Sequence, residues 1–209
     1  MNRLKITILA LTASLSINQL IAQDFSFGGK AGLNYSSLSG DNDSNGLGFH
    51  LGGLMNVGLS DALNFRLELL ASSRRMAFSE TSELLNVKTK ISGSASPLYI
   101  AIPIMYKYNV NDKISLMAGP QISFLATNKS SVTTTTTVGS LDPVKTKSTS
   151  NSKTGYRSSE FGFALGGEYN LSENLGMGLR YVRALQSRTD LTNADDNFNV
   201  IQLSALYNF

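Results

Sequence analysis

The chain has 209 residues and a formal net charge of +3, so it is long enough for one domain or two small ones, and its charge gives no reason to expect a nucleic-acid partner. Because it has no cysteine, disulfides, thiolate metal sites, cysteine nucleophiles and a lipidated cysteine anchor are excluded. A single histidine, His50, leaves no spare candidates for a histidine-based zinc site or a Ser-His-Asp triad, so we expect no metal and no cofactor.

Residues 1–22 have the pattern of an export signal. Arg3 and Lys5 give the segment a charged start, and an apolar run follows that ends close to the small residue Ala22. The run is shorter than the roughly 20 residues that a membrane-spanning helix needs. We therefore expect a signal peptide at residues 1–22 and an exported domain at residues 23–209. An N-terminal membrane anchor or a buried helix is the alternative.

The exported domain shows alternation of apolar and polar side chains, the period-two pattern of strands with one apolar face. Each alternating segment is near the length of about 9–11 residues that a tilted membrane strand needs. The pattern divides into eight segments: 25–35, 47–59, 63–69, 98–108, 114–124, 161–169, 175–181 and 201–209.

The connections between these segments are alternately long and short. Three short turns share one form, with Ser or Asn, an acid, one further residue and then Leu or Ile; their acids are Asp61, Asp112 and Glu173. The other connections are longer and polar: 39–46, 73–96, 127–157 and 185–197. Short turns at one rim and long loops at the other are typical of outer-membrane barrels, and an even strand number puts both termini at the short-turn rim.

Side-chain size indicates which face of the barrel points outward. The non-apolar face is crowded with glycine, as the narrow interior of an eight-stranded barrel requires. The apolar face carries no charge in its central stretch and has aromatic residues near its ends: Phe25, Tyr108, Phe124, Tyr169, Tyr181 and Phe209. This arrangement favours a lipid-facing exterior with aromatic girdles over the alternative, a soluble ligand-binding barrel with an apolar inside. We therefore predict an all-β fold, an eight-stranded antiparallel up-and-down transmembrane β-barrel.

The end of the chain carries a more specific pattern. Residues 201–209 place an apolar residue at every second position and end on Tyr207 and Phe209. This resembles the C-terminal strand by which the barrel assembly machinery recognises bacterial outer-membrane proteins, so we assign Tyr207 and Phe209 as a barrel-assembly signal. The alternative is an ordinary last strand.

Residues 98–108, followed after a short turn by residues 117–121, resemble the central hairpin of the porin-family outer-membrane β-barrel domain common in Bacteroidetes. The resemblance spans roughly residues 23–209. It implies the barrel fold and a location in the bacterial outer membrane, but the family name does not establish conduction.

Seven charged residues fall on the inner face by alternation: Lys30, Arg66, Glu68, Lys107, Glu160, Glu168 and Arg180. An unpaired ion in a dry interior costs several kcal/mol, so these charges must pair. We interpret them as a lumenal salt-bridge network that plugs the barrel; an ion pathway is the alternative. Eight strands leave little lumen, and channels come with about 16 or more. His50 lies on the same face and is interpreted as a polar filler.

The long connection 127–157 is rich in Ser and Thr and carries five cations against the single acid Asp142. Its Thr-rich stretches favour strand, so residues 132–138 and 144–149 are predicted to extend the barrel as a hairpin that turns at 139–143. Its basic residues could contact lipopolysaccharide phosphates or a surface partner. A solvated loop without a partner is the alternative.

Taken together, these patterns predict a monomeric, non-enzymatic barrel with a structural or surface-interaction role. Its expected partners are outer-membrane lipid and the barrel assembly machinery, and nucleic acid is not among them. The first alternative is a narrow pore or a small-ligand transport barrel. The second is an outer-membrane lipid-modifying enzyme, which would have to use His50 because no other histidine is present.

Overall fold

A computed structural model of the chain describes residues 25–38, 44–139, 141–187 and 197–209. The expected signal peptide lies outside these ranges. No helix in them is long and apolar enough to cross a membrane. The described chain forms ten strands: β1 (Phe25–Leu38), β2 (Asn45–Gly58), β3 (Leu63–Ser73), β4 (Met76–Leu84), β5 (Val87–Asn109), β6 (Ile114–Val138), β7 (Val144–Asn151), β8 (Ser159–Asn170), β9 (Leu175–Ala184) and β10 (Phe198–Asn208).

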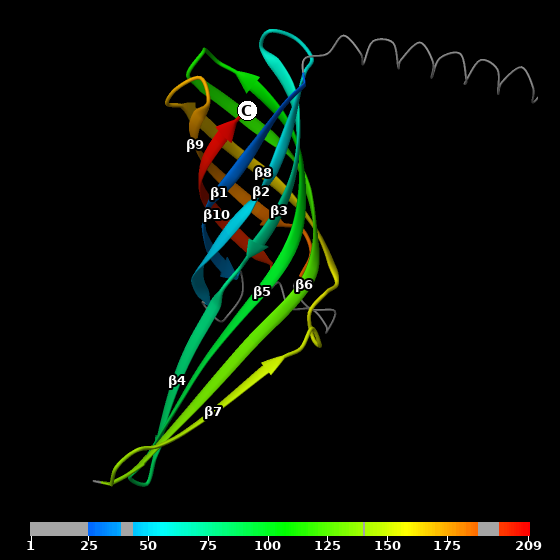
Figure 1. Cartoon of the computed structure of the whole chain (residues 1–209). Coiled ribbons are helices and arrows are strands. Elements are labelled where there is room, and N and C mark those ends of the chain that lie inside the picture. The colour runs from blue at the N-terminus through cyan, green and yellow to red at the C-terminus, as the bar shows by residue number, and fades with distance from the viewer. Residues whose placement is uncertain (1–24, 39–43, 140, 188–196) are drawn as a thin grey trace, which may run out of the picture.

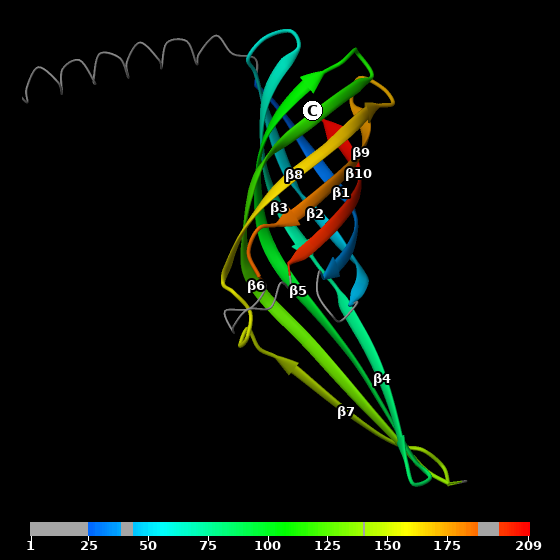
Figure 2. The ribbon, with the colours of Figure 1, turned by 180° about the vertical axis from the view of Figure 1, so that it is seen from behind.

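Eight of these strands form a closed antiparallel ring in the order β1-β2-β3-β5-β6-β8-β9-β10. The ring closes where the first and last strands pair, from Gly28 opposite Asn208 to Leu38 opposite Phe198. Figure 1 shows the strands tilted around the ring, and Figure 2 shows the same ring from behind. The predicted eight-stranded barrel is confirmed, and the described residues form two further strands outside the ring, β4 and β7.

The three short turns repeat in structure as they do in sequence. In each, the residue after the strand donates from its backbone nitrogen to the carbonyl oxygen four residues later, as Leu59 does to Leu63 at 2.9 Å and Leu171 to Leu175 at 2.8 Å. The Ser or Asn of the repeat accepts a hydrogen bond from a backbone nitrogen of its own turn, as the Asn111 side chain does from Ile114 at 2.8 Å. The repeated polar residue therefore closes the turn.

Beyond the long-loop end of the ring, the same sheet continues as a four-stranded extension that we call the blade: β4, residues 87–96 of β5, residues 129–138 of β6, and β7. Its order is β4-β5-β6-β7; the outer edge of β7 is open, and the outer edge of β4 pairs with β2 at one position, Ala77 opposite Asn45. Figures 1 and 2 show it as a long, narrow projection from the end of the ring away from the C-terminus.

The blade confirms one prediction and corrects another. The predicted extension within residues 127–157 is present as the end of β6 paired with β7. Residues 73–96 were expected to be a polar connection, and that expectation is wrong: they form the hairpin of β4 with β5. Their side chains are mostly Ser, Thr and charged residues, so they lack strong apolar alternation, and the partner strand β6 supplies the pairing that stabilises them.

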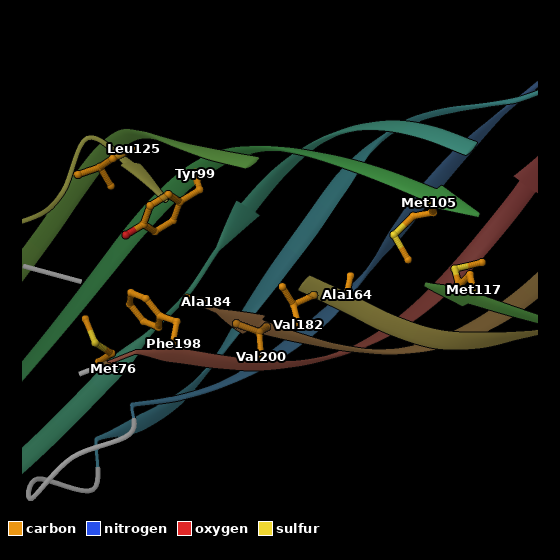
Figure 3. Packing of buried hydrophobic residues seen from close by; sticks show 10 residues of the cluster. All are labelled: Met76, Tyr99, Met105, Met117, Leu125, Ala164, Val182, Ala184, Phe198 and Val200. Carbon is orange, nitrogen blue, oxygen red and sulfur yellow. The ribbon is translucent and has the colours of Figure 1, made fainter. Parts of the chain in front are cut away.

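Side-chain burial separates the two faces of the ring. The outer face exposes large apolar residues such as Leu33, Leu51 and Leu203, and all six predicted girdle aromatics are exposed. The inner face holds a cluster of ten buried apolar residues drawn in Figure 3: Met76, Tyr99, Met105, Met117, Leu125, Ala164, Val182, Ala184, Phe198 and Val200. An apolar exterior with a packed, partly charged interior is inverted relative to a soluble barrel.

Candidate functional site: the charged interior

Glu68 on β3 is the centre of the interior charges. Two guanidinium nitrogens of Arg180 on β9 donate to its two carboxylate oxygens at 2.7 and 2.6 Å, which is the bidentate geometry of a strong ion pair. The ammonium group of Lys30 on β1 reaches the same carboxylate at 3.4 Å. All three side chains are at most 3% exposed, so both signs of charge are removed from water together.

A second carboxylate, Glu168 on β8, holds the neighbouring cations. Lys107 on β5 donates to it at 2.9 Å, and Arg66 on β3 forms an ion pair with its other oxygen. Arg66 also lies 3.8 Å from Glu68, so it connects the two carboxylates. The group therefore contains the four cations Lys30, Arg66, Lys107 and Arg180 against two acids; we call these six residues the lower charge layer.

Glu160 belongs to a different group from the other six predicted residues. It pairs at 2.5 Å with Arg74, which follows β3 and lies nearer the blade. Arg74 also donates to the Ser123 hydroxyl at 3.2 Å. Its guanidinium carbon lies 4.4 Å from the Tyr99 ring centre and 5.2 Å from that of Phe198. These five residues form the upper charge layer, where a cation stacks on aromatic faces.

Sequence reasoning missed Arg74 because it was assigned to the connection 73–96. A signal was present: Arg66, Glu68, Ser72 and Arg74 are all even-numbered and therefore lie on one face of a strand that continues past residue 69. All four side chains are buried. Extending the alternation would have supplied the cation that Glu160 requires.

Uncharged polar residues occupy the interior between the two layers. Nδ1 of His50 lies 2.8 Å from the side-chain oxygen Oδ1 of Asn34, and Nε2 lies 2.9 Å from the Ser204 hydroxyl. Asn34 is also hydrogen-bonded to the Ser72 hydroxyl at 3.1 Å and accepts from Gln202 at 3.1 Å. Both polar atoms of the imidazole are thus engaged by neutral groups, and no carboxylate of the described residues is hydrogen-bonded to it to orient it as a base.

One glycine makes room for His50. A Cβ atom added to Gly32 would lie 2.7 Å from Cε1 of His50 and 2.0 Å from the carbonyl oxygen of Leu203 on the neighbouring strand. Both separations are shorter than any real Cβ contact, so the close approach of β1 to β10 at this level requires glycine.

At the short-turn end the interior opens into a vestibule of about 560 Å³. Seven asparagines and the three turn acids line it, and Lys107 of the lower charge layer is also part of its wall. The complete lining is Ser26, Asn56, Asp61, Ala62, Asn64, Lys107, Asn109, Asn111, Asp112, Asn170, Glu173, Asn174, Asn208 and Phe209. Several of these asparagines are already bonded, as Asn170 is to the Asp112 carbonyl and Asn174 to that of Asn208. Within the described ranges, no group of three His, Cys, Asp or Glu residues could hold a metal ion.

The predicted assembly signal lies at the seam of the ring. Tyr207 and Phe209 are exposed on the outer face, with their ring centres 5.7 Å apart. The backbone nitrogen of Phe209 donates to the carbonyl oxygen of Phe27 at 2.9 Å, so the last residue is tied to the first strand.

Comparison with known proteins gives a family. No curated protein matches the chain. One similar solved structure is Ail of Yersinia pestis in complex with the heparin analogue sucrose octasulfate, with 14% sequence identity, coverage of 89% of this chain and 99% of that one, and a TM-score of 0.48. Neisserial surface protein A has 12% identity, coverage of 89% of this chain and 99% of that one, and a TM-score of 0.44. CarO of Acinetobacter baumannii has 9% identity, coverage of 85% of this chain and 97% of that one, and a TM-score of 0.41. The family model described as outer membrane protein beta-barrel domain matches residues 21–190, so this chain belongs to that family and is a bacterial outer-membrane protein.

Proposed function

We propose that this protein is a non-conducting, non-enzymatic barrel that anchors its blade outside the outer membrane. Short turns of outer-membrane barrels face the periplasm and long connections face outward, so the blade stands on the cell-surface side. The observation that carries the proposal is the contact of Glu68 with Arg180. Their strands β3 and β9 are four places apart in a ring of eight, so this ion pair spans the diameter.

Two further observations support a closed interior. The upper charge layer crosses the interior a second time, since Arg74 follows β3 and Glu160 lies on β8. A ring of eight strands is also about as narrow as a barrel can be while its interior is filled by side chains. An ion would have to displace two buried layers of paired charge to cross the barrel.

Conductance in planar lipid bilayers tests this function. We expect the wild-type protein to give no current steps, and the E68A/R180A variant, which removes both side chains that span the diameter, to give measurable ones. Wild-type current steps of defined size that change with E68A/R180A would instead establish the alternative, a narrow pore. The vestibule is the observation that favours that alternative, because it brings solvent to Lys107 from the periplasmic side.

The environment of His50 supports a non-enzymatic role. Its ring nitrogens are bonded to Asn34 and Ser204, and the residue is 1% exposed, so no substrate could reach it without rearrangement of the interior. If His50 were catalytic, the His50→Ala variant would abolish a lipid modification in the host membrane. We expect the lipids of the host to be the same with wild type and with His50→Ala.

Three further assignments belong to the same proposal. The barrel is of the Bacteroidetes porin-family type, as residues 98–108 and 117–121 indicate. Tyr207 and Phe209 act as the signal for the barrel assembly machinery, and the folded barrel is a monomer in lipid. If the F209A variant assembled more slowly than wild type in cells but had the same stability once folded, this would support the assignment of Tyr207 and Phe209 as the assembly signal.

A further inference from the structure

The two faces of the blade differ in charge. Directly paired residues of antiparallel strands lie on the same face, and successive residues alternate, so strand register assigns each side chain to a face. Lys90 and Lys145 are both opposite Thr135, and Lys88 is opposite Thr137 two residues further along β6. Lys147 lies two residues from Lys145, on the same face.

The fifth lysine of the blade, Lys129, shares this face, because it lies an even number of residues from Thr135 on β6. All five lysines are exposed, and none forms an ion pair with another described residue. One acid accompanies them, Glu83, opposite Lys88. Ser and Thr hydroxyls fill the positions between them, including Ser92, Thr133, Thr135 and Thr137.

The opposite face of the blade has no lysine. It carries apolar residues and Thr, with Glu80 as its only charged residue: Phe78, Leu84, Val87, Ile91, Val132, Val138 and Val144 are its large apolar members. Lysines on an edge strand protect it from pairing with other chains, which would account for Lys145 and Lys147 on β7. Edge protection does not account for Lys88, Lys90 and Lys129, which lie on the two central strands.

Strand β5 shows where the lysine face points. Its odd residues Tyr99 and Met105 are buried in the barrel, whereas Ile100 is exposed to lipid. Lys88 and Lys90 are even, so their face continues the lipid-facing surface beyond Leu98, the last apolar residue on that side. Lys129 is opposite Ser96, two residues past Leu98, and Lys88 is ten residues past it.

These positions place the lysine face beside the neighbouring lipids. At about 3.3 Å per residue and a strand tilt of about 40°, the lysines span heights from roughly 5 to roughly 25 Å above the last apolar residue. That is the layer occupied by the phosphate groups and the inner sugars of lipopolysaccharide molecules in the outer leaflet. Lys90 and Lys145 are separated by two strand spacings, about 10 Å, which leaves both able to contact one saccharide.

We propose that the lysine face of the blade binds phosphate-bearing saccharides of adjacent lipopolysaccharide, with lysines as counter-ions and the intervening hydroxyls as hydrogen-bond partners. This names the ligand of the surface role proposed above and rests on the same orientation of the barrel. It does not depend on a closed interior, so a conducting barrel would leave it standing.

The test compares wild type with two variants, each as the full-length protein in zwitterionic nanodiscs. In the removal variant K88T/K145T/K147S, three lysines are lost. In the exchange variant K88T/T89K/K145T/T146K/K147S/S148K, the same three lysines move to the opposite face, and both composition and net charge are unchanged. The probes are purified rough-type lipopolysaccharide, the same material after chemical dephosphorylation, and heparin as a soluble polyanion.

We expect wild type to bind phosphorylated lipopolysaccharide on the order of tenfold more tightly than either variant, as three exposed charge contacts imply. Dephosphorylation should remove that difference. Exchange-variant binding within twofold of wild type would overturn the proposal, because net charge alone would then suffice. If the wild-type protein bound heparin but did not bind lipopolysaccharide, the proposal would also be overturned. A mobility difference between unboiled and boiled samples confirms that each variant has folded.

Discussion

Glu68 and Arg180 form a bidentate ion pair across the full diameter of the barrel, with nitrogen–oxygen distances of 2.6 and 2.7 Å. The two residues are 112 positions apart in the chain and come from opposite strands of the ring. Lys30 and Arg66 lie at 3.4 and 3.8 Å from the same carboxylate, so Glu68 interacts with three cations at once.

Loss of the Glu68 charge should therefore be severe. We expect Glu68→Gln to lower the free energy of unfolding by about 3–5 kcal/mol, because Arg180 and Lys30 remain buried without their counter-charge. The double variant E68Q/R180Q should lose less than the sum of the two single variants. Urea unfolding in lipid vesicles, followed by the mobility of unboiled samples, measures each loss. Strictly additive losses would show that the two side chains do not interact.

Arg74 and Arg75 provide a matched pair for the upper charge layer. Arg74 is buried against two aromatic rings and Glu160, whereas its neighbour Arg75 is exposed. We expect Arg74→Lys to cost about 2 kcal/mol, since an ammonium group cannot reproduce planar stacking with a simultaneous bond to Ser123. Arg75→Lys should change stability by less than about 0.5 kcal/mol. Equal effects at both positions would contradict the stacked geometry.

Gly32 and Gly29 test the close contact at the seam. Gly32→Ala places a methyl group against the Leu203 carbonyl and His50, so we expect the ring to close poorly and the heat-dependent mobility shift to weaken or disappear. Gly29 lies on the outer face, and a methyl group added there would have no other atom within 4 Å. Gly29→Ala should therefore fold normally and gain a few tenths of a kcal/mol from a stiffer unfolded chain. A Gly32→Ala barrel of wild-type stability would refute the crowding.

The blade should be dispensable for the ring. We expect a chain in which residues 77–95 and 130–150 are each replaced by an Asn-Gly turn to retain the mobility shift. The pairings of β5 with β6 inside the ring, from Leu98 opposite Thr127 onward, stay intact. The backbone hydrogen bond that the Arg74 nitrogen donates to the Pro97 oxygen at 2.9 Å closes the shortened hairpin. Gel mobility before and after boiling is the measurement. Failure to fold, with the full chain folding under the same conditions, would make the blade part of the barrel's stability.

Much of the ring could be predicted from alternation because a barrel strand has two chemically different sides. Lipid on one side and a narrow interior on the other leave few choices at each position, so the alternation assigned Lys30 and Arg180 to the inner face. The turn repeat added the order of the strands. The partners within the interior could not be predicted in the same way, since they depend on which strands lie opposite each other.

The blade shows the limit of that reasoning. Above the membrane neither face of a sheet has to contact lipid. Residues 76–96 therefore carry many Ser, Thr and charged residues, and their few large apolar side chains are too widely spaced to give the alternation that marks a lipid-facing strand. Because the alternation ends at this level, it also failed to predict that Arg74, the residue directly after β3, points into the interior and pairs with Glu160. Glu160 was assigned to one network with Glu68 and Glu168, whereas its partner is Arg74 in a separate layer.

The distance in sequence between Glu68 and Arg180 also bears on how the protein folds. Arg180 lies on the next-to-last strand of the ring, so the Glu68 carboxylate has no bidentate partner until almost the whole chain has been inserted. A half-formed sheet would hold unpaired charges at a hydrocarbon boundary, which is strongly unfavourable. Insertion and closure should therefore be a single cooperative event, slow because its decisive contacts are so far apart along the chain.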